Sequence, residues 1–288
     1  MISRLGILLM RALAPLPLRW IRGLGWAVGV LLFLVVRSRR TVVDVNLRLC
    51  FPHWSEAQRR QVAREVFIHV AQSFLDRAWL WHGDPDVLLR RLVLTGAVRE
   101  LAGHEGTIVF CPHFVGLDAG VTALSQQVAR RFVGIYTRQS NPVVDAWALK
   151  GRYRFGDSRP MNRSEGVRDI VSVLREGGVL YLLPDMNFGA QDSIFVPFYG
   201  VPAATVPSLS RFARLGRAKV VPLITRLTPT GYEVRVMEAW AGFPTRDAEA
   251  DTALMNRRLQ EYIDEMPSQY YWVHKRFKTR PPGEPGVY

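Results

Sequence analysis

A histidine and an aspartate five positions apart are the residues of this chain best suited to acid–base chemistry. His113 follows an apolar run at residues 107–111, and Asp118 comes shortly after Gly116. If the run is a strand and a helix begins after the turn, His113 lies where α/β proteins place ligand-contacting residues. The aspartate would then set the imidazole tautomer and stabilise the imidazolium that forms when histidine removes a proton. A loop histidine beside an acid at a helix N-terminus, without a catalytic role, explains the spacing equally well.

Motifs that the sequence lacks limit the kinds of group that such a base would activate. There is no G-x-S-x-G elbow and no H-E-x-x-H motif, which disfavours serine hydrolysis and metal hydrolysis. Cys111 belongs to the apolar run, so a core thiol is favoured over a nucleophile. Only Cys50 accompanies it, which predicts a reducing compartment rather than a disulfide framework or a cysteine zinc site. We therefore expect a substrate hydroxyl to be activated, without a metal or a cofactor.

Short β-branched runs that alternate with helical patterns must position these residues. The runs predict strands at residues 107–111, 132–136, 179–183 and 219–224, with a further one at 232–238. Helices are predicted at residues 55–81, 117–131, 142–155, 164–176, 205–215 and 247–266, with a capping box at Ser55 and Gln58 and a helix end at Gly177. This alternation predicts a single α/β domain with a largely parallel central sheet flanked by helices.

The positive charge of the chain is concentrated at its N-terminus. The chain carries a net charge of +13, and its first 40 residues hold seven arginines without a lysine or a carboxylate. These arginines flank an apolar run at residues 24–36, which favours anionic lipid over nucleic acid as the partner. We therefore expect a membrane anchor at residues 1–40 and a catalytic domain at residues 41–288.

The length of the apolar run does not decide whether this anchor spans the bilayer or lies at its surface. A helix of 13 residues rises about 20 Å, short of the roughly 30 Å of a hydrocarbon core. Extension back to Leu16 gives about 21 residues, provided that Arg19 and Arg22 reach the interface. A transmembrane helix and an interfacial helix are both compatible with the sequence. Gly25 and Gly29 predict close helix packing.

Several stretches beyond the histidine motif resemble one known family. They are NLRLCFP at 46–52, N-P-x-x-D at 141–145, GRYR at 151–154, PDMNFG at 184–189, FVPFYGVPAAT at 195–205 and YWVHKRFKTRPPGEP at 271–285. Together with the H-x-x-x-x-D motif, they resemble the bacterial lipid A late (secondary) acyltransferases of the glycerolipid acyltransferase superfamily. The resemblance covers nearly the whole chain. Many members carry glutamate at the last motif position, where this chain has Asp118.

The resemblance implies an enzyme at the cytoplasmic face of the bacterial inner membrane. It would move a fatty acyl group from acyl carrier protein to a hydroxyl of a Kdo-lipid A precursor, with His113 as general base and Asp118 as its partner. Arg152 of the G-R-x-R stretch and Asp185 of the P-D stretch would serve the substrate or the oxyanion. In physical terms Arg152 could stabilise an oxyanion or clamp a phosphate, while a solvated helix arginine is its alternative explanation. Asp185 follows a strand end, where it could position an arginine or a sugar or stabilise a turn.

Two further features and two other functions stay open. The basic residues Lys275, Arg276, Lys278 and Arg280 suit an acidic carrier protein or lipid phosphates, or form a solvated face. The apolar residues 195–207 could line an acyl channel or form a core loop. An acyltransferase acting on lysophospholipid or glycerol phosphate is the closest other enzyme. A non-catalytic, membrane-tethered binder of anionic ligands is the alternative of another class.

Overall fold

A central sheet organises the computed structural model, which describes residues 2–162 and 166–288. Among these residues, seven strands form the sheet in the order β1-β9-β8-β2-β5-β3-β4. Their bounds are β1 (Leu92–Gly96), β2 (Thr107–Phe110), β3 (Phe132–Tyr136), β4 (Ser158–Asn162), β5 (Val179–Leu182), β8 (Lys219–Thr228) and β9 (Gly231–Val236). Every neighbouring pair is parallel except β8 and β9. The predicted α/β fold with a largely parallel sheet is confirmed.

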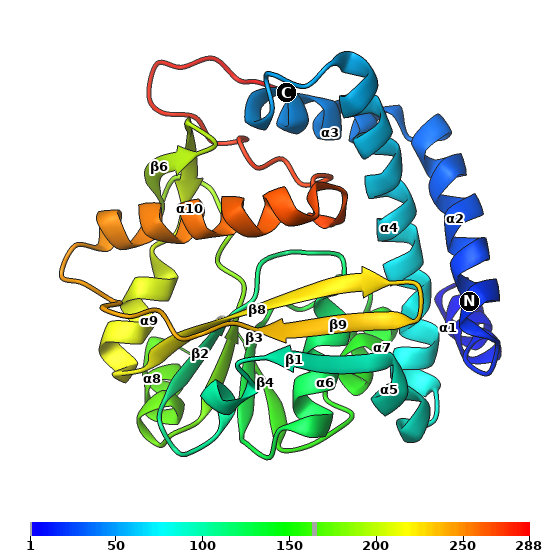
Figure 1. Ribbon diagram of the computed structural model, residues 1–288, viewed down its shortest axis with the longest axis horizontal. Helices are drawn as coiled ribbons and strands as arrows, with labels where there is room; N and C mark the ends of the chain where they lie inside the picture. Colours follow the sequence, from blue (N-terminus) through cyan, green and yellow to red (C-terminus); the bar gives the residue numbers. More distant parts are fainter. Residues whose placement is uncertain (1, 163–165) are drawn as a thin grey trace.

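Helices cover both faces of this sheet because alternate strand residues are apolar on each side. Ile108 and Phe110 of β2 pack with α8 (Val167–Arg175), α9 (Ser208–Gly216) and α10 (Ala248–Glu265). Val109, which points to the other face, packs with α6 (Leu117–Gln127) and α7 (Pro142–Arg152). Figure 1 shows α10 lying across the sheet on the side that carries the hairpin of β6 (Ile194–Phe198) and β7 (Val201–Thr205). The C-terminal part of the chain reaches the carboxyl edge of the parallel strands, where Tyr270 forms an isolated bridge with Phe114.

Among the described residues, five helices precede the first strand of the sheet. They are α1 (Ile2–Leu13), α2 (Leu18–Val35), α3 (Arg37–Cys50), α4 (Glu56–His82) and α5 (Pro85–Arg91), which leads into β1. The predicted capping box of Ser55 and Gln58 starts α4. Figure 1 shows α2 running beside α4 along most of its length. A Cβ added at Gly25 would lie 2.8 Å from the Cα of Gln72, and one at Gly29 would overlap the backbone of Ile68. The predicted close packing through these glycines is confirmed.

The other predicted elements occur close to their expected positions. The helix predicted at 164–176 corresponds to α8, although residues 164 and 165 lie outside the described part of the chain. It ends where expected, because Gly177 has a φ of 83°, a left-handed conformation that glycine adopts without a Cβ clash. Strands β1 and β4, helices α1, α3 and α5 and the β6–β7 hairpin were not predicted. The hairpin occupies the segment expected to line a channel or form a core loop.

Candidate active site

Parallel strand pairing brings His113 and Asp185 together. Strands β2 and β5 are neighbours, with Phe110 opposite Leu182. Each functional residue lies three positions beyond its member of this pair, so both side chains reach the same point past the carboxyl ends of the strands. This is the edge at which α/β sheets bind their ligands.

The Asp185 carboxylate is held by three hydrogen bonds. Its Oδ1 lies 2.7 Å from Nδ1 of His113, and its Oδ2 accepts from the backbone N–H of His113 at 3.0 Å and from the hydroxyl of Tyr270 at 3.0 Å. Burial opposes ionisation, but His113 and these hydrogen bonds outweigh it, so the pKa of Asp185 lies below its ordinary value. The ionised carboxylate accepts the Nδ1 proton of a neutral imidazole, which leaves Nε2 as the proton acceptor.

Exposure differs sharply between the two partners. The Asp185 side chain has no solvent exposure, whereas that of His113 is 18% exposed. A buried carboxylate behind an accessible imidazole is the arrangement that stabilises an imidazolium during proton transfer. The geometry therefore suits His113 to act as a general base toward a bound hydroxyl.

Asp118 was expected from the sequence to contact the imidazole of His113, but the structure places it elsewhere. It lies in the first turn of α6, and the carboxylate that contacts the imidazole is that of Asp185 instead. Asp118 accepts hydrogen bonds from Nε of Arg77 and from Nε of Arg152, each at 2.7 Å. Although burial opposes ionisation, the two guanidinium groups hold the pKa of Asp118 well below its usual range. The negative charge of Asp118 is therefore neutralised by two arginines, Arg77 from α4 and Arg152 from α7.

Arg152 reaches this carboxylate from the C-terminus of α7. The preceding residue, Gly151, packs directly on the indole of Trp81, where a Cβ would overlap the ring. This contact lets α7 approach α4 closely and places Arg152 beside Asp118. The Arg152 side chain stays 35% exposed, and among the described residues its two terminal nitrogens have no hydrogen-bond partner. Those nitrogens can donate to an anionic group of a substrate.

The C-terminal segment, residues 267–288, completes the site. Besides the Tyr270 hydroxyl, the backbone N–H of Tyr271 donates to the carbonyl oxygen of His113 at 2.9 Å. Further along, Nε2 of His274 accepts from the backbone N–H of Asn187, two residues after Asp185, at 3.1 Å. Burial and then the nearby Arg276 and His113 lower the pKa of His274 to about 4, so its imidazole is neutral.

Sequence reasoning missed three of these residues: Tyr270, His274 and Arg77. Tyr270 directly precedes the C-terminal block that resembles the acyltransferases, and His274 lies within it, so that block is the signal that could have indicated them. Arg77 has no comparable signal, because it is one of many arginines in the chain and only the tertiary packing of α4 brings it to Asp118.

Two other groups named from the sequence have structural contacts. Cys111 is buried, and burial raises the pKa of its thiol far above the ordinary range, which agrees with a core thiol. In the basic tail, Arg276 is also buried and donates to the carbonyl oxygen of Ala204 and the hydroxyl of Thr205. Arg276 is therefore not available to an acidic partner, whereas Lys275 and Lys278 are exposed. Among the described residues there is no cluster of three or more His, Cys, Asp or Glu side chains arranged to hold a metal ion.

A histidine hydrogen-bonded to a buried carboxylate at the carboxyl edge of an α/β sheet is typical of proteins that use acid–base chemistry. The model of the bacterial lipid A biosynthesis acyltransferase family matches residues 1–279. The chain is 31% identical over 293 residues to a lipid A biosynthesis lauroyltransferase of Escherichia coli, covering 99% of this chain and 94% of the relative. A lipid A biosynthesis acyltransferase of Haemophilus influenzae is 33% identical over 286 residues, with 97% and 88% covered. A palmitoleoyltransferase of lipid A biosynthesis from E. coli is 28% identical over 293 residues, with 99% and 92% covered.

The chain therefore belongs to the bacterial lipid A biosynthesis acyltransferase family, as the sequence motifs suggested. It is an acyltransferase of lipid A biosynthesis.

Proposed function

We propose that the enzyme transfers a fatty acyl group from acyl carrier protein to a hydroxyl of a Kdo-lipid A precursor, at the cytoplasmic face of the inner membrane. The names of the relatives, which include a lauroyltransferase and a palmitoleoyltransferase, support a fatty acyl group. The observation that carries the chemistry is the accessible imidazole of His113 with its Nδ1 held by the buried carboxylate of Asp185.

In the proposed reaction Nε2 of His113 removes the proton of the acceptor hydroxyl. The hydroxyl oxygen attacks the carbonyl carbon of the donor thioester, and Asp185 stabilises the imidazolium that forms. The tetrahedral intermediate then expels the carrier thiolate, which takes the proton back from His113. The ester and a free carrier thiol are the products, and the enzyme returns to its starting protonation state.

Arg152 is proposed to bind a negatively charged group during this reaction. Its terminal nitrogens, which no described residue contacts by a hydrogen bond, could stabilise the oxyanion or bind a phosphate of the lipid acceptor. In this scheme Asp118 is a positioning residue, since its carboxylate holds the Nε of Arg152 and the Nε of Arg77. The assignment moves the role of imidazole partner from Asp118 to Asp185.

Replacement of the base tests the proposal directly. His113→Ala is expected to abolish acyl transfer, measured with radiolabelled acyl carrier protein and a Kdo-lipid A precursor in detergent. The variant should remain folded and membrane-associated, because the backbone N–H of residue 113 and the Tyr270 hydroxyl still donate to Asp185, although loss of the imidazole partner should lower the thermal unfolding midpoint. Full transfer by this variant would refute the proposed mechanism.

The acceptor is tested separately by mass spectrometry of lipids from a strain lacking the gene. We expect lipid A that lacks one acyl chain and phospholipids that are unchanged. Intact lipid A with altered phospholipids would instead support an acyltransferase for lysophospholipid or glycerol phosphate. Salt-sensitive lipid binding without any acyl transfer would support the non-catalytic binder.

A further inference from the structure

The apolar helix α2 is anchored to the catalytic domain at both of its ends. It is the one helix among the described residues that is long and apolar enough to cross a membrane, by length and composition. Eighteen residues rise about 27 Å, close to the roughly 30 Å of a hydrocarbon core. A spanning helix must deliver its two ends to opposite sides of the bilayer, so the contacts of each end decide whether α2 can span.

The N-terminal end of α2 is held on the domain by α1. Met10 and Leu13 of α1 are buried against Ala78 of α4. At the start of the chain, Ser3 accepts a hydrogen bond from the side chain of Asn141, the N-cap of α7, at 2.9 Å. The segment that would lie beyond the membrane in a spanning arrangement is therefore packed on the same domain that holds the active site.

The C-terminal end of α2 is held by the main core. Phe33 packs edge-to-face on Phe67 of α4, with ring centroids 5.7 Å apart, and its carbonyl oxygen accepts from Arg40 at 2.9 Å. The helix that follows, α3, buries Val43 and Leu47 in the core that contains β2. This end cannot leave the domain without opening that core.

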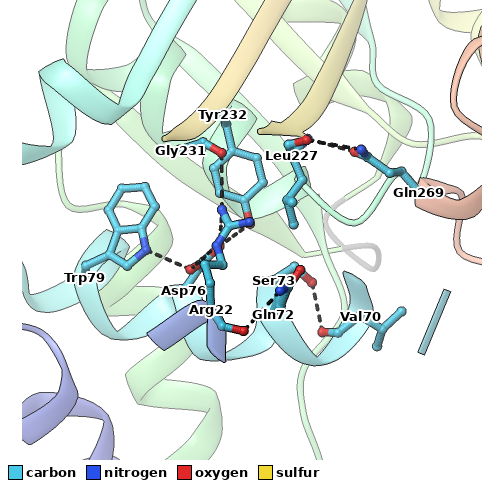
Figure 2. Close-up of polar contacts among 10 residues, drawn as sticks. All are labelled: Arg22, Val70, Gln72, Ser73, Asp76, Trp79, Leu227, Gly231, Tyr232 and Gln269. Atoms are coloured by element: carbon cyan, nitrogen blue, oxygen red, sulfur yellow. Dashed lines mark hydrogen bonds and ion pairs between the residues drawn. The ribbon is translucent and has the colours of Figure 1, made fainter. Parts of the chain in front are cut away.

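A buried ion pair joins the second turn of α2 to the domain, as Figure 2 shows. Arg22 pairs with Asp76 of α4 at 2.9 Å and also donates to the carbonyl oxygen of Gly231. Asp76 has no solvent exposure and further accepts from Tyr232 at 2.6 Å and Trp79 at 2.9 Å. Arg22 therefore does not extend toward a membrane interface, as a spanning arrangement would require.

The partner helix α4 cannot accompany α2 into hydrocarbon. It carries several charged residues, among them Arg59, Arg60, Arg64, Glu65 and Arg77. Charged side chains at the centre of a bilayer are costly and occur there rarely. Since α2 packs on α4 and α4 remains in water, α2 lies along the surface of the bilayer and does not cross it.

The outward side of these helices is apolar and surrounded by positive charge. Large exposed side chains include Leu5, Leu8 and Leu9 on α1 and Trp20, Leu31 and Leu34 on α2, and we call this set the outer apolar face. Arg4, Arg19, Arg37 and Arg39 are exposed near it, and no carboxylate occurs before Asp44. Apolar helices with basic neighbours bind the headgroup region of anionic bilayers.

From these contacts we infer that α1 and α2 form a monotopic attachment: the outer apolar face enters one leaflet of an anionic bilayer, and α2 does not span it. This inference rests on the proposed inner-membrane location of the enzyme. It fixes the N-terminus and the active site on the same side of the membrane.

Cysteine labelling of the full chain tests the topology. Gly6 and Gly286 are both exposed, with open space where a Cβ would lie, and the native Cys50 and Cys111 are buried, so Gly6→Cys and Gly286→Cys give matched probes of the N-terminus and the domain. In intact spheroplasts we expect neither probe to react with a membrane-impermeant maleimide, and both to react after lysis. Reaction of Gly6→Cys alone in intact spheroplasts would overturn the inference. Reaction of both would support it while refuting the proposed cytoplasmic location.

Flotation with vesicles tests the lipid partner. Leu8→Glu with Leu31→Glu places two charges on the outer apolar face, and Leu89→Glu with Leu215→Glu places two charges on similarly exposed leucines of α5 and α9. On vesicles of phosphatidylglycerol and phosphatidylethanolamine, the first pair should reduce the floated fraction at least tenfold, and the second should leave it unchanged. Equal flotation of both pairs would overturn the inference.

Discussion

Asp185 and Asp118 are two buried carboxylates with different partners, and the partner decides what each can do. Asp185 accepts a hydrogen bond from Nδ1 of the partly exposed His113, so its negative charge can stabilise the imidazolium when the imidazole becomes protonated. Asp118 faces two guanidinium groups that are always charged, so it sets their position instead. The structure therefore separates a histidine–carboxylate pair from a carboxylate held by two arginines.

Exchange of each carboxylate for an amide distinguishes these roles. Asp185→Asn should lower kcat by about 10³- to 10⁴-fold, because the amide cannot hold the Nδ1–H tautomer in place. Asp118→Asn should lower it less and mainly raise KM if Arg152 binds a phosphate, since the amide oxygen can still accept one hydrogen bond. Both are measured by steady-state acyl transfer. The reverse order of effects on kcat would restore Asp118 as the partner of the histidine.

His274 makes the stability of the folded protein depend on pH, and a single substitution can test this contribution. Its pKa is about 4 in the folded protein against an ordinary value of 6.5. Between these values the unfolded chain binds a proton at this position and the folded chain does not, so stability falls as the pH falls. His274→Gln removes this contribution while keeping an acceptor for Asn187. Urea unfolding in detergent from pH 7.5 to 4.5 should therefore show a flatter stability curve for the variant, and parallel curves would contradict the assignment.

The sequence indicated candidate site residues but not the contacts between them. A local motif indicated His113 and Asp118, and the family resemblance indicated Arg152 and Asp185. All four lie just beyond strands or in the terminal turns of helices. Spacing favoured the local partner, five residues away. The actual partner of His113 lies 72 residues away, and its position depends on the parallel register of β2 against β5. A register between distant strands leaves no local trace in the sequence.

At the scale of elements, the packing of α2 on α4 depends on glycines that face the partner helix. The sequence indicated this contact because two glycines four positions apart share one side of a helix. The β6–β7 hairpin escaped prediction because its two-residue turn is Tyr199-Gly200, with φ of 51° and 76°. Such a turn usually contains asparagine or aspartate before the glycine. Tyr199 is held there by hydrogen bonds to Gln260 and Asp264, which only the folded chain provides.

Two glycines of α2 offer a matched test of this packing. Gly29→Ala should destabilise the fold by about 1 to 3 kcal/mol, because the added methyl group overlaps the backbone of Ile68. Gly23→Ala should stabilise it by about 0.5 to 1 kcal/mol, since Gly23 is exposed and an added Cβ would have nothing within 4 Å. Urea unfolding in detergent measures both. A similar effect of the two substitutions would mean that α2 does not pack on α4 in solution.

At the scale of the whole molecule, one buried ion pair connects the N-terminal helices, α4 and the sheet. Arg22 comes from α2, Asp76 from α4, and Tyr232 and Gly231 from β9 (Figure 2). Burial raises the pKa of Asp76 despite these partners, so the carboxylate depends on the nearby guanidinium to remain charged. Loss of one charge therefore affects three elements at once.

Removal of one member of this pair should cost more than neutralisation of both. Arg22→Met leaves a buried carboxylate without its counter-ion and should destabilise the fold by about 3 to 5 kcal/mol. Arg22→Met combined with Asp76→Asn should recover part of that loss, because the amide is neutral and can still accept from Tyr232 or Trp79. Urea unfolding of the wild type, both single variants and the double variant gives the coupling energy. Strictly additive effects would exclude a functional ion pair.

The position of the C-terminal segment has a consequence for the time at which the enzyme becomes active. During synthesis, the N-terminal helices and the sheet leave the ribosome before Tyr270 and Tyr271, which hold Asp185 and the loop of His113. Tyr288 donates a hydrogen bond to the side chain of Asn46 in α3, so this contact also forms only after residue 288 has emerged. Domains fold as their residues emerge. A nascent chain that has exposed the N-terminal helices and the sheet therefore still lacks the two tyrosines that hold Asp185 and the loop of His113, so these contacts form only after the C-terminal segment has emerged.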